Sequence, residues 1–271
     1  MQGQMSWFEG STPLKITKPI RLIELFAGIG AQAKALENLG VPFEHYRVCE
    51  IDKHAVKSYN AVHGTEFGIS DICQLHADDL GVVDTNQYTY ILTYSFPCQD
   101  LSLAGRRKGM DKGTRSGLLW EVERILDEMD ELPQILLMEN VPEVVGQKNI
   151  KHFAEWVGFL ESKGYMNKWE ILNAKDFDIP QNRARCFMVS WLGDHYYEFP
   201  QPVKRTRKLL DMLEDEVDET YYLSDEQVQT LNLHKARHDA QGHGFGWKPY
   251  DIERERERER ERELRPQFRR K

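Results

Sequence analysis

Short apolar runs alternate with longer amphipathic stretches along the chain up to about residue 200. Apolar runs predict buried strands, and they lie at residues 19–26, 45–52, 88–96, 133–140 and 185–193. Helices are predicted between them, at residues 31–40, 54–64, 117–132 and 150–164. The helix over 117–132 has the clearest pattern, with one apolar face formed by Leu118, Leu119, Val122, Ile125, Leu126 and Met129. Strands separated by helices of this length predict an α/β fold with a parallel, doubly wound, Rossmann-like sheet.

The pattern changes beyond residue 200. Residues 203–240 predict one or two amphipathic helices, residues 241–250 are rich in glycine and aromatic residues, and residues 253–263 alternate Glu and Arg. The alternating run has no apolar face, which favours a solvated helix or tail over a charged interaction arm. The predicted organisation is an N-terminal extension (1–19), a catalytic domain (20–200), the start of a smaller recognition region (201–250) and a charged tail (251–271).

Composition and charge limit the classes of function that the chain can have. The formal net charge of −8 lowers the expectation of a nucleic-acid partner, although a local basic cleft can coexist with acidic surfaces elsewhere. No run of 18 or more apolar residues predicts a membrane span, and the N-terminus does not resemble a secretory signal. The four cysteines are far apart, which argues against a zinc site or disulfides and favours a reducing, cytoplasmic location.

Ligands of a doubly wound sheet bind beyond the carboxyl ends of its strands, and polar motifs lie at these positions. The turn from Phe26 to Gly30 follows the first strand, and Glu50 ends the second strand, 20 residues after Gly30. This spacing is typical of a carboxylate that binds ribose, and the absence of a full GxGxxG favours a ligand without phosphates, such as S-adenosylmethionine. The glycines are also compatible with a plain tight turn. Asp71 and the following Ile72 are candidates to meet an adenine, with a helix cap as the alternative for Asp71.

A cysteine follows the strand over 88–96, within the segment Ser95-Phe96-Pro97-Cys98-Gln99. A single cysteine is most often a small buried hydrophobe. Cys98 follows a proline at a strand end, however, which predicts a loop position where a nucleophile is useful. Cys49, Cys73 and Cys186 lie within or beside predicted strands and are interpreted as structural.

Two further motifs lie at the ends of later strands. Glu139 heads Glu-Asn-Val at the end of a buried strand, where a carboxylate needs a partner or a task. Arg183 and Arg185 lie two residues apart in an extended segment, so their side chains point the same way and are suited to clamp an oxygen. A helix cap and a surface arginine pair are the structural alternatives for these motifs.

The glycine turn, Pro-Cys-Gln, Glu-Asn-Val and Gln-Asn-Arg-Ala-Arg, in this order and each at a strand end, resemble the signature motifs of the cytosine-5 DNA methyltransferase family. The resemblance extends from Ile20 to Ser224 and includes the segment Arg115–Leu126, which is similar to the family's helix beside the cofactor. It implies an S-adenosylmethionine-dependent enzyme that methylates carbon 5 of cytosine in double-stranded DNA, as part of a restriction-modification or phage or host modification system.

The resemblance also implies roles for individual residues. Cys98 is expected to add to carbon 6 of a flipped-out cytosine, Glu139 to hold ring nitrogen 3, and Arg183 and Arg185 to contact the ring carbonyl and nearby backbone. No metal is implied. The expected cofactor contacts are Phe26, Gly28, Gly30, Glu50, Ile51, Asp71, Ile72, Pro97 and Leu119.

The sequence departs from the family pattern at three places. Ala31 stands where a further glycine is usual, and Tyr90 stands where the family usually has Asp. The family's recognition region and Gly-Asn segment are not found after Gly246, so the chain is expected to be truncated, with a second polypeptide as the source of the missing segments. A split-enzyme subunit inactive alone, and a tRNA cytosine-5 methyltransferase, are the alternative functions. Nucleoid association is expected if the source is prokaryotic.

Overall fold

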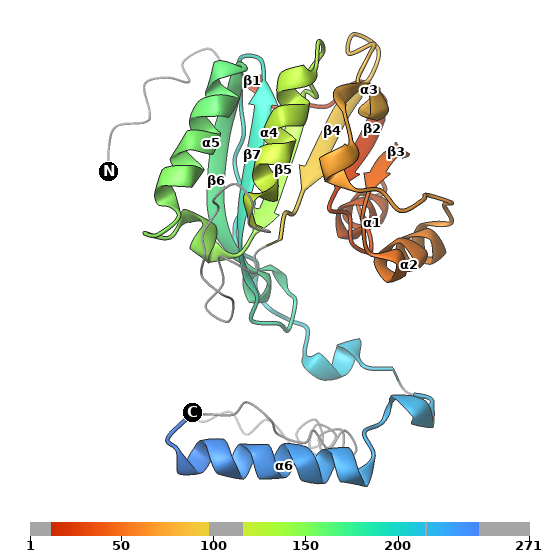
Figure 1. The fold of residues 1–271 in the computed structure, drawn as a ribbon, viewed down its shortest axis with the longest axis vertical. Helices are drawn as coiled ribbons and strands as arrows, with labels where there is room; N and C mark the ends of the chain where they lie inside the picture. Colours follow the sequence, from red (N-terminus) through yellow and green to blue (C-terminus); the bar gives the residue numbers. More distant parts are fainter. Residues whose placement is uncertain (1–11, 98–115, 215, 244–271) are drawn as a thin grey trace, which may run out of the picture. The chain divides into compact units, whose positions relative to one another are not determined.

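The computed structural model describes residues 12–97, 116–214 and 216–243. The chain divides into two compact units, one of residues 1–177 and 182–204 and the other of residues 178–181 and 205–271 (Figure 1). In the second unit the described elements are the short helices η6 (Leu209–Met212) and η7 (Glu219–Tyr221) and the helix α6 (Asp225–Ala240). The side chain of Ser224 caps α6 by accepting from the backbone N–H of Gln227.

The first unit contains a six-stranded sheet in the order β3-β2-β4-β5-β7-β6. Its strands are β2 (Ile20–Leu25), β3 (Phe43–Cys49), β4 (Thr89–Tyr94), β5 (Ile135–Asn140), β6 (Tyr165–Asn173) and β7 (Ala184–Leu192). A small second sheet pairs β1 (Thr12–Pro13) with β8 (His195–Tyr196). The helices are α1 (Ala31–Asn38), α2 (Lys53–His63), α3 (Ala77–Leu80), α4 (Leu119–Glu128) and α5 (Ile150–Ser162), with single turns η2 (Ile72–Gln74), η3 (Ser116–Leu118), η4 (Pro142–Val145) and η5 (Ala174–Phe177).

Strand order reverses between β2 and β4, because β3 pairs with one edge of β2 and β4 with the other, all in parallel. The helix α1 that follows β2 packs on one side of the sheet, with Ile20 and Leu22, and α4 packs on the other side, with Ile23 and Leu25. Doubly wound folds bind their ligands beyond the carboxyl ends of the strands at such a reversal, which makes this edge of the sheet the place to look for a site. The predicted α/β, Rossmann-like fold is confirmed.

Both faces of the sheet are covered, which explains the near-continuous apolar runs of β2 and β4. Alternate residues of each strand enter opposite layers: Ile23 and Leu25 pack on one side, and Ile20 and Leu22 on the other. Figure 1 shows α4 and α5 lying over one face of the sheet. The apolar face predicted for residues 117–132 is confirmed, with fully buried side chains at Leu119, Val122, Ile125 and Leu126.

The sheet differs from an all-parallel one at β7 and β6. β7 runs antiparallel to β5, and β6, which the apolar pattern did not predict, runs antiparallel to β7. Residues 174–183 connect β6 to β7 without a crossover helix, and a connection this short favours antiparallel pairing. β6 escapes the pattern because it is an edge strand whose side chains are mostly half-buried or exposed.

Candidate active site

The turn between β2 and α1 is held in an unusual backbone conformation. Phe26, Gly28 and Gly30 have φ angles of 57°, 57° and 80°, in the left-handed region that favours glycine. A Cβ on Gly30 would lie 2.3 Å from His63 Nε2 and 2.6 Å from Tyr59 Cε2, so only glycine fits there. A Cβ on Gly28 would meet no atom of the described residues within 4 Å. Gly30 therefore serves packing, whereas Gly28 faces open space.

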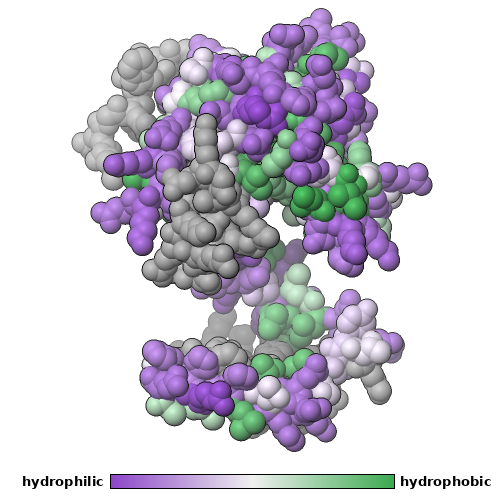
Figure 2. All heavy atoms as spheres, viewed as in Figure 1, coloured by the Kyte–Doolittle hydropathy of each residue, from purple (hydrophilic) through white to green (hydrophobic). Residues whose placement is uncertain are grey.

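Glu50 lies against this turn, at the carboxyl end of β3. Its Oε2 accepts the backbone N–H of Gly28 at 2.9 Å, and its Oε1 accepts the N–H of Asp52 at 2.8 Å. These two bonds orient the carboxylate and leave further acceptor capacity on each oxygen. Ile51, the next residue, is 64% exposed. Figure 2 shows apolar surface in the region of α1 and α2, where Ile29, Ile51 and Val62 are exposed.

Asp71 and Ile72 lie beside the end of β3, because Ser70 donates its N–H to the carbonyl of Glu50 at 2.9 Å. Asp71 caps η2: its Oδ1 accepts the N–H of Cys73 at 3.0 Å. The side chain of Ile72 is 4% exposed and belongs to the core, so only its backbone is available to a ligand. Within the described residues, no strand lies between α2 and Asp71.

The segment that leads to the predicted nucleophile is anchored by hydrogen bonds at the carboxyl end of the sheet. After β4, the carbonyl of Phe96 accepts from Asn140 Nδ2 at 3.0 Å, and Asn140 itself is buried at the end of β5. Gln32 of α1 donates from Nε2 to the hydroxyl of Ser95 at 3.1 Å. Pro97, the last described residue of this segment, is half-buried. Cys98 lies outside the described residues. So does Arg115, the first residue of the segment that was expected beside the cofactor.

The other three cysteines are free and differ in exposure. Cys49 and Cys186 are buried, and burial raises the pKa of Cys49 to about 11 and that of Cys186 to about 12. Cys73 is exposed rather than packed in the core, and its pKa is raised, mainly by desolvation. Since the thiolate is the nucleophilic form, none of these three is activated at neutral pH.

Glu139 and Arg185 come together across the β5–β7 pair. Arg185 Nε donates to Glu139 Oε1 at 2.9 Å, and both side chains are about one fifth exposed, at 22% and 23%. Arg185 Nη1 also donates to the carbonyl of Ala184 at 2.7 Å. The backbone of Arg183 bonds to Asn173, and its exposed guanidinium has no hydrogen bond to any other described residue.

Leu119, expected at the cofactor, is fully buried in the core. Its side chain therefore offers no exposed surface to a ligand in the described part of the chain. Tyr90, which stands where the family usually has Asp, is also fully buried. Its hydroxyl accepts from Arg21 Nη1 at 2.8 Å and donates to the carbonyl of Val83 at 2.5 Å. Arg21 also donates from Nε to the Glu44 carboxylate at 3.0 Å, so the Tyr90 phenol is its second partner.

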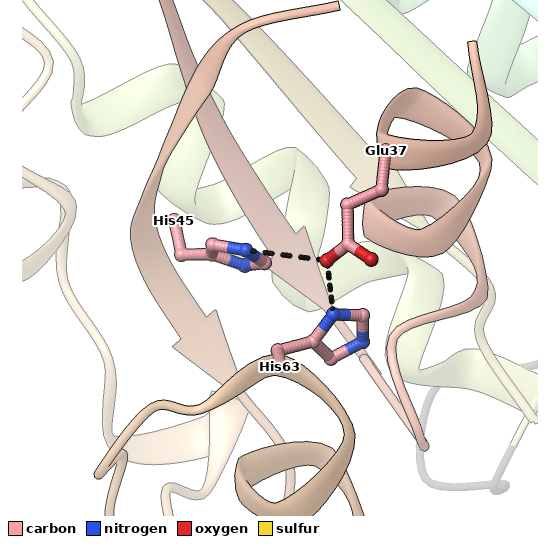
Figure 3. A group of neighbouring side chains, drawn as sticks. All are labelled: Glu37, His45 and His63. Atoms are coloured by element: carbon pink, nitrogen blue, oxygen red, sulfur yellow. Dashed lines mark hydrogen bonds and ion pairs between the residues drawn. The ribbon is translucent and has the colours of Figure 1, made fainter. Parts of the chain in front are cut away.

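Sequence patterns missed a polar network behind the glycine turn, drawn in Figure 3 for Glu37, His45 and His63. His63 Nδ1 lies 2.7 Å from Glu37 Oε1, and His63 Nε2 lies 3.1 Å from the carbonyl oxygen of Ile29. The Tyr59 hydroxyl donates to buried Glu24 at 2.5 Å and lies 2.9 Å from His45 Nδ1. Glu24, an acidic residue inside an apolar run, was the one visible signal of this network.

Residues 20–271 match the family model for C-5 cytosine-specific DNA methylases. The chain belongs to this family. It is accordingly a cytosine-5 DNA methyltransferase, and methyltransferases of this family generally use S-adenosylmethionine.

Two curated relatives of this methylase are similar over most of its length. The type II methyltransferase M.NlaX of Neisseria lactamica is 37% identical. The match covers 86% of this chain and 72% of M.NlaX. The type II methyltransferase M2.ScrFI of Lactococcus lactis is 33% identical, covering 77% and 71%. Among solved structures, the S. pombe Dnmt2 methyltransferase is similar with a TM-score of 0.63 and 25% identity, covering 80% of this chain and 67% of the other. The helices of the described residues are too short or too polar to span a bilayer.

Proposed function

We propose that this methyltransferase acts on cytosine in double-stranded DNA, with Cys98 as its nucleophile, Glu139 as the group that holds the ring and Arg185 as the residue that orients Glu139. The observation that carries the proposal is the convergence of three strand ends. The glycine turn follows β2, the segment leading to Cys98 follows β4, and Glu139 is the last residue but one of β5, which is the neighbour of β4. The bonds from Gln32 to Ser95 and from Asn140 to the Phe96 carbonyl connect these loops.

The residues at the glycine turn fit S-adenosylmethionine. The Glu50 carboxylate offers acceptors to ribose hydroxyls, exposed Ile51 offers apolar surface to an adenine, and the space beside Gly28 is open. Phe26, Asp71, the Ile72 backbone and Pro97 complete the proposed contacts, whereas Leu119 supports the site from the core. When bound, this cofactor supplies the methyl group that carbon 5 of cytosine receives.

The proposed chemistry assigns one task to each residue around the cytosine. The Cys98 thiolate forms a bond to carbon 6, and the displaced electron pair of the ring moves toward nitrogen 3. Glu139 holds nitrogen 3 through a shared proton and stabilises the charge that develops there. After carbon 5 is methylated, a base removes its proton, the ring double bond reforms, and the thiolate of Cys98 leaves.

Arg185 is placed to orient Glu139, because a charge-assisted hydrogen bond fixes one carboxylate oxygen and leaves the other free to face a ring. Arg183 has an exposed guanidinium available for a phosphate or the ring carbonyl. Extruding the cytosine from a duplex costs a few kcal/mol, which contacts of this kind must offset.

The test of Cys98 uses covalent trapping. Fluorine at carbon 5 cannot leave as a proton does, so DNA containing 5-fluorocytosine should hold the wild-type protein in a stable adduct at Cys98. Cys98→Ser should form no adduct and should lose methyl transfer, because a hydroxyl without an activating base is a much poorer nucleophile. Cys73→Ser is the matched control, since Cys73 is exposed, and it should trap like the wild type. An adduct that maps to Cys73 would reject the assignment.

The substrate class is tested by product analysis on duplex DNA and on tRNA, with DNA as the expected acceptor. The "type II" names of the relatives favour a role beside a restriction enzyme, and an orphan methyltransferase of Bacillus phage SPR is also similar, at 30% identity. Methylation of tRNA alone would favour the alternative function. The second polypeptide that the sequence analysis expects stays a prediction.

A further inference from the structure

His63 is held between two hydrogen-bond acceptors. Its Nδ1 lies 2.7 Å from Glu37 Oε1, and its Nε2 lies 3.1 Å from the carbonyl oxygen of Ile29. The pKa of Glu37 is lowered to about 2, first by Lys34 and then by His63, so its carboxylate is ionised and can only accept. Glu37 and the Ile29 carbonyl both accept, so each ring nitrogen of His63 is placed to donate a hydrogen bond. The side chain has no exposed surface, so water does not compete for these bonds.

A metal ion is the alternative explanation for Glu37, His45 and His63, whose ligand atoms lie within 4.8 Å of one another. Ligands of tetrahedral zinc lie about 2.0–2.1 Å from the metal and therefore roughly 3.3 Å from each other. The separation of 2.7 Å between Glu37 and His63 is too short for two such ligands, and that of 3.8 Å between Glu37 and His45 is too long. The distances favour a directly hydrogen-bonded pair.

The glycine turn is pinned at two consecutive residues. Glu50 accepts the N–H of Gly28, and His63 donates to the carbonyl of the next residue, Ile29. The rings of His63 and Tyr59 also pack closely against Gly30, where an added Cβ would lie within 2.6 Å of both rings. The turn thus has little freedom while the His63 side chain is in place.

We propose that His63 is a positioning residue for the cofactor: it fixes the backbone of the glycine turn and so preorganises the surface on which S-adenosylmethionine binds. This inference rests on the proposed location of the cofactor at that turn. His63 acts on the proposed cofactor site through the backbone of Ile29 and its neighbour Gly28, so its loss should affect cofactor binding rather than the chemical step.

The groups around His63 come from several elements and hold the ring in one orientation. Glu37 of α1 is held in turn by Lys34, whose Nζ donates to Glu37 Oε2 at 2.7 Å. His45 of β3 and Tyr59 of α2 flank the ring, with ring centroids 5.1 Å and 4.6 Å from that of His63. Glu24 of β2 lies behind Tyr59 and receives its hydroxyl hydrogen bond.

Two substitutions separate hydrogen bonding from packing. His63→Phe keeps a flat ring against Tyr59 and Gly30 but removes both donors. His63→Gln removes the ring but retains an amide donor that can reach the Ile29 carbonyl. His63→Phe should weaken S-adenosylmethionine binding, measured by calorimetry, by about tenfold or more, and His63→Gln by about threefold or less. The KM for the cofactor should rise in parallel, with kcat at saturation little changed.

A packing role predicts the reverse order, because phenylalanine preserves the ring contacts, and that result would overturn the proposal. His54→Phe is the control on the same helix: His54 is exposed, and its substitution should leave affinity unchanged. Thermal melts without cofactor check that each variant folds.

Further measurements distinguish a failure of the His63 proposal from a failure of the proposed cofactor site. If Glu50→Ala weakens cofactor binding and His63→Phe does not, only the role of His63 is rejected. If the wild type binds no S-adenosylmethionine, the cofactor site itself is rejected. Titration with zinc chloride alone should show no stoichiometric binding. Zinc binding that is lost in both His45→Phe and His63→Phe would replace the hydrogen-bonded pair with a metal site.

Discussion

The carboxylates of Glu50, Glu139 and Glu24 have different hydrogen-bond partners and different burial. Glu50 accepts two backbone N–H groups and is oriented by them, whereas Glu139 is oriented by the guanidinium of Arg185. All three hydrogen bonds involve a carboxylate, and hydrogen bonds to a charged group contribute more than neutral ones. Glu24, by contrast, is almost fully buried and receives the Tyr59 hydroxyl in place of a cation.

At the residue scale, Glu50→Ala should weaken S-adenosylmethionine binding by about 1.5–3 kcal/mol, because the ribose loses charge-assisted hydrogen bonds. Isothermal calorimetry on both proteins measures the difference. Glu161→Ala on α5 is a suitable control, since Glu161 is exposed and lies on another element. An affinity that is unchanged in Glu50→Ala would mean that the adenosine binds elsewhere.

At the element scale, the β2–α1 turn depends on glycines for two separate reasons. Gly28 and Gly30 share a positive φ, but only Gly30 is in contact with neighbouring rings. The helix α2 that presents those rings begins at a capped residue, since the Asp52 carboxylate accepts the N–H groups of His54 and Ala55. The cap and the close packing together fix α2 against the turn.

Gly30→Ala should therefore lower the free energy of unfolding by about 2–5 kcal/mol, which combines left-handed strain with overpacking. Gly28→Ala, with the same strain but no clash, should cost about 1–2 kcal/mol. Because the Cβ on Gly28 enters the open space, this second variant should lose cofactor affinity more than stability. Urea denaturation and calorimetry compare the two, and an equal loss of stability would contradict the distinction.

At the scale of the whole molecule, the buried Glu24 links stability to pH. Burial raises its pKa above the unfolded value, so the folded protein retains a proton that the unfolded chain releases. The stability contributed by protonated Glu24 is fully present below the unfolded pKa and is lost as the pH rises through the folded pKa. The Tyr59 hydrogen bond opposes this shift but does not cancel it.

Glu24→Gln removes this titration while conserving size. The wild type should therefore lose unfolding free energy relative to Glu24→Gln as the pH rises. The loss should begin near the unfolded pKa of Glu24 and be complete above its raised folded pKa. Urea denaturation over the range from pH 4 to pH 8 measures it. A difference that stays constant with pH would show that Glu24 titrates alike in both states.

Much of the site is encoded locally, and the sequence alone therefore determined it. The apolar runs predicted β2 through β5, the spacing of Glu50 from Gly30 predicted a carboxylate beside the turn, and the order of the motifs indicated the family. Each of these depends on neighbours along the chain or on spacing within one strand-helix-strand unit, where local geometry is regular. The roles of the individual site residues, Cys98 and Arg183 among them, remain predictions.

Tertiary structure decided the contacts between residues that are distant in sequence. The antiparallel pairing of β6 and β7 places Arg185 on Glu139, and the folding of α2 against the turn places His63 on Ile29. Such contacts depend on strand register and helix packing, in which a shift of one residue would turn the side chains to the opposite face. The hydrophobic periodicity along the chain does not specify strand register or helix packing, because both depend on all the neighbouring elements together.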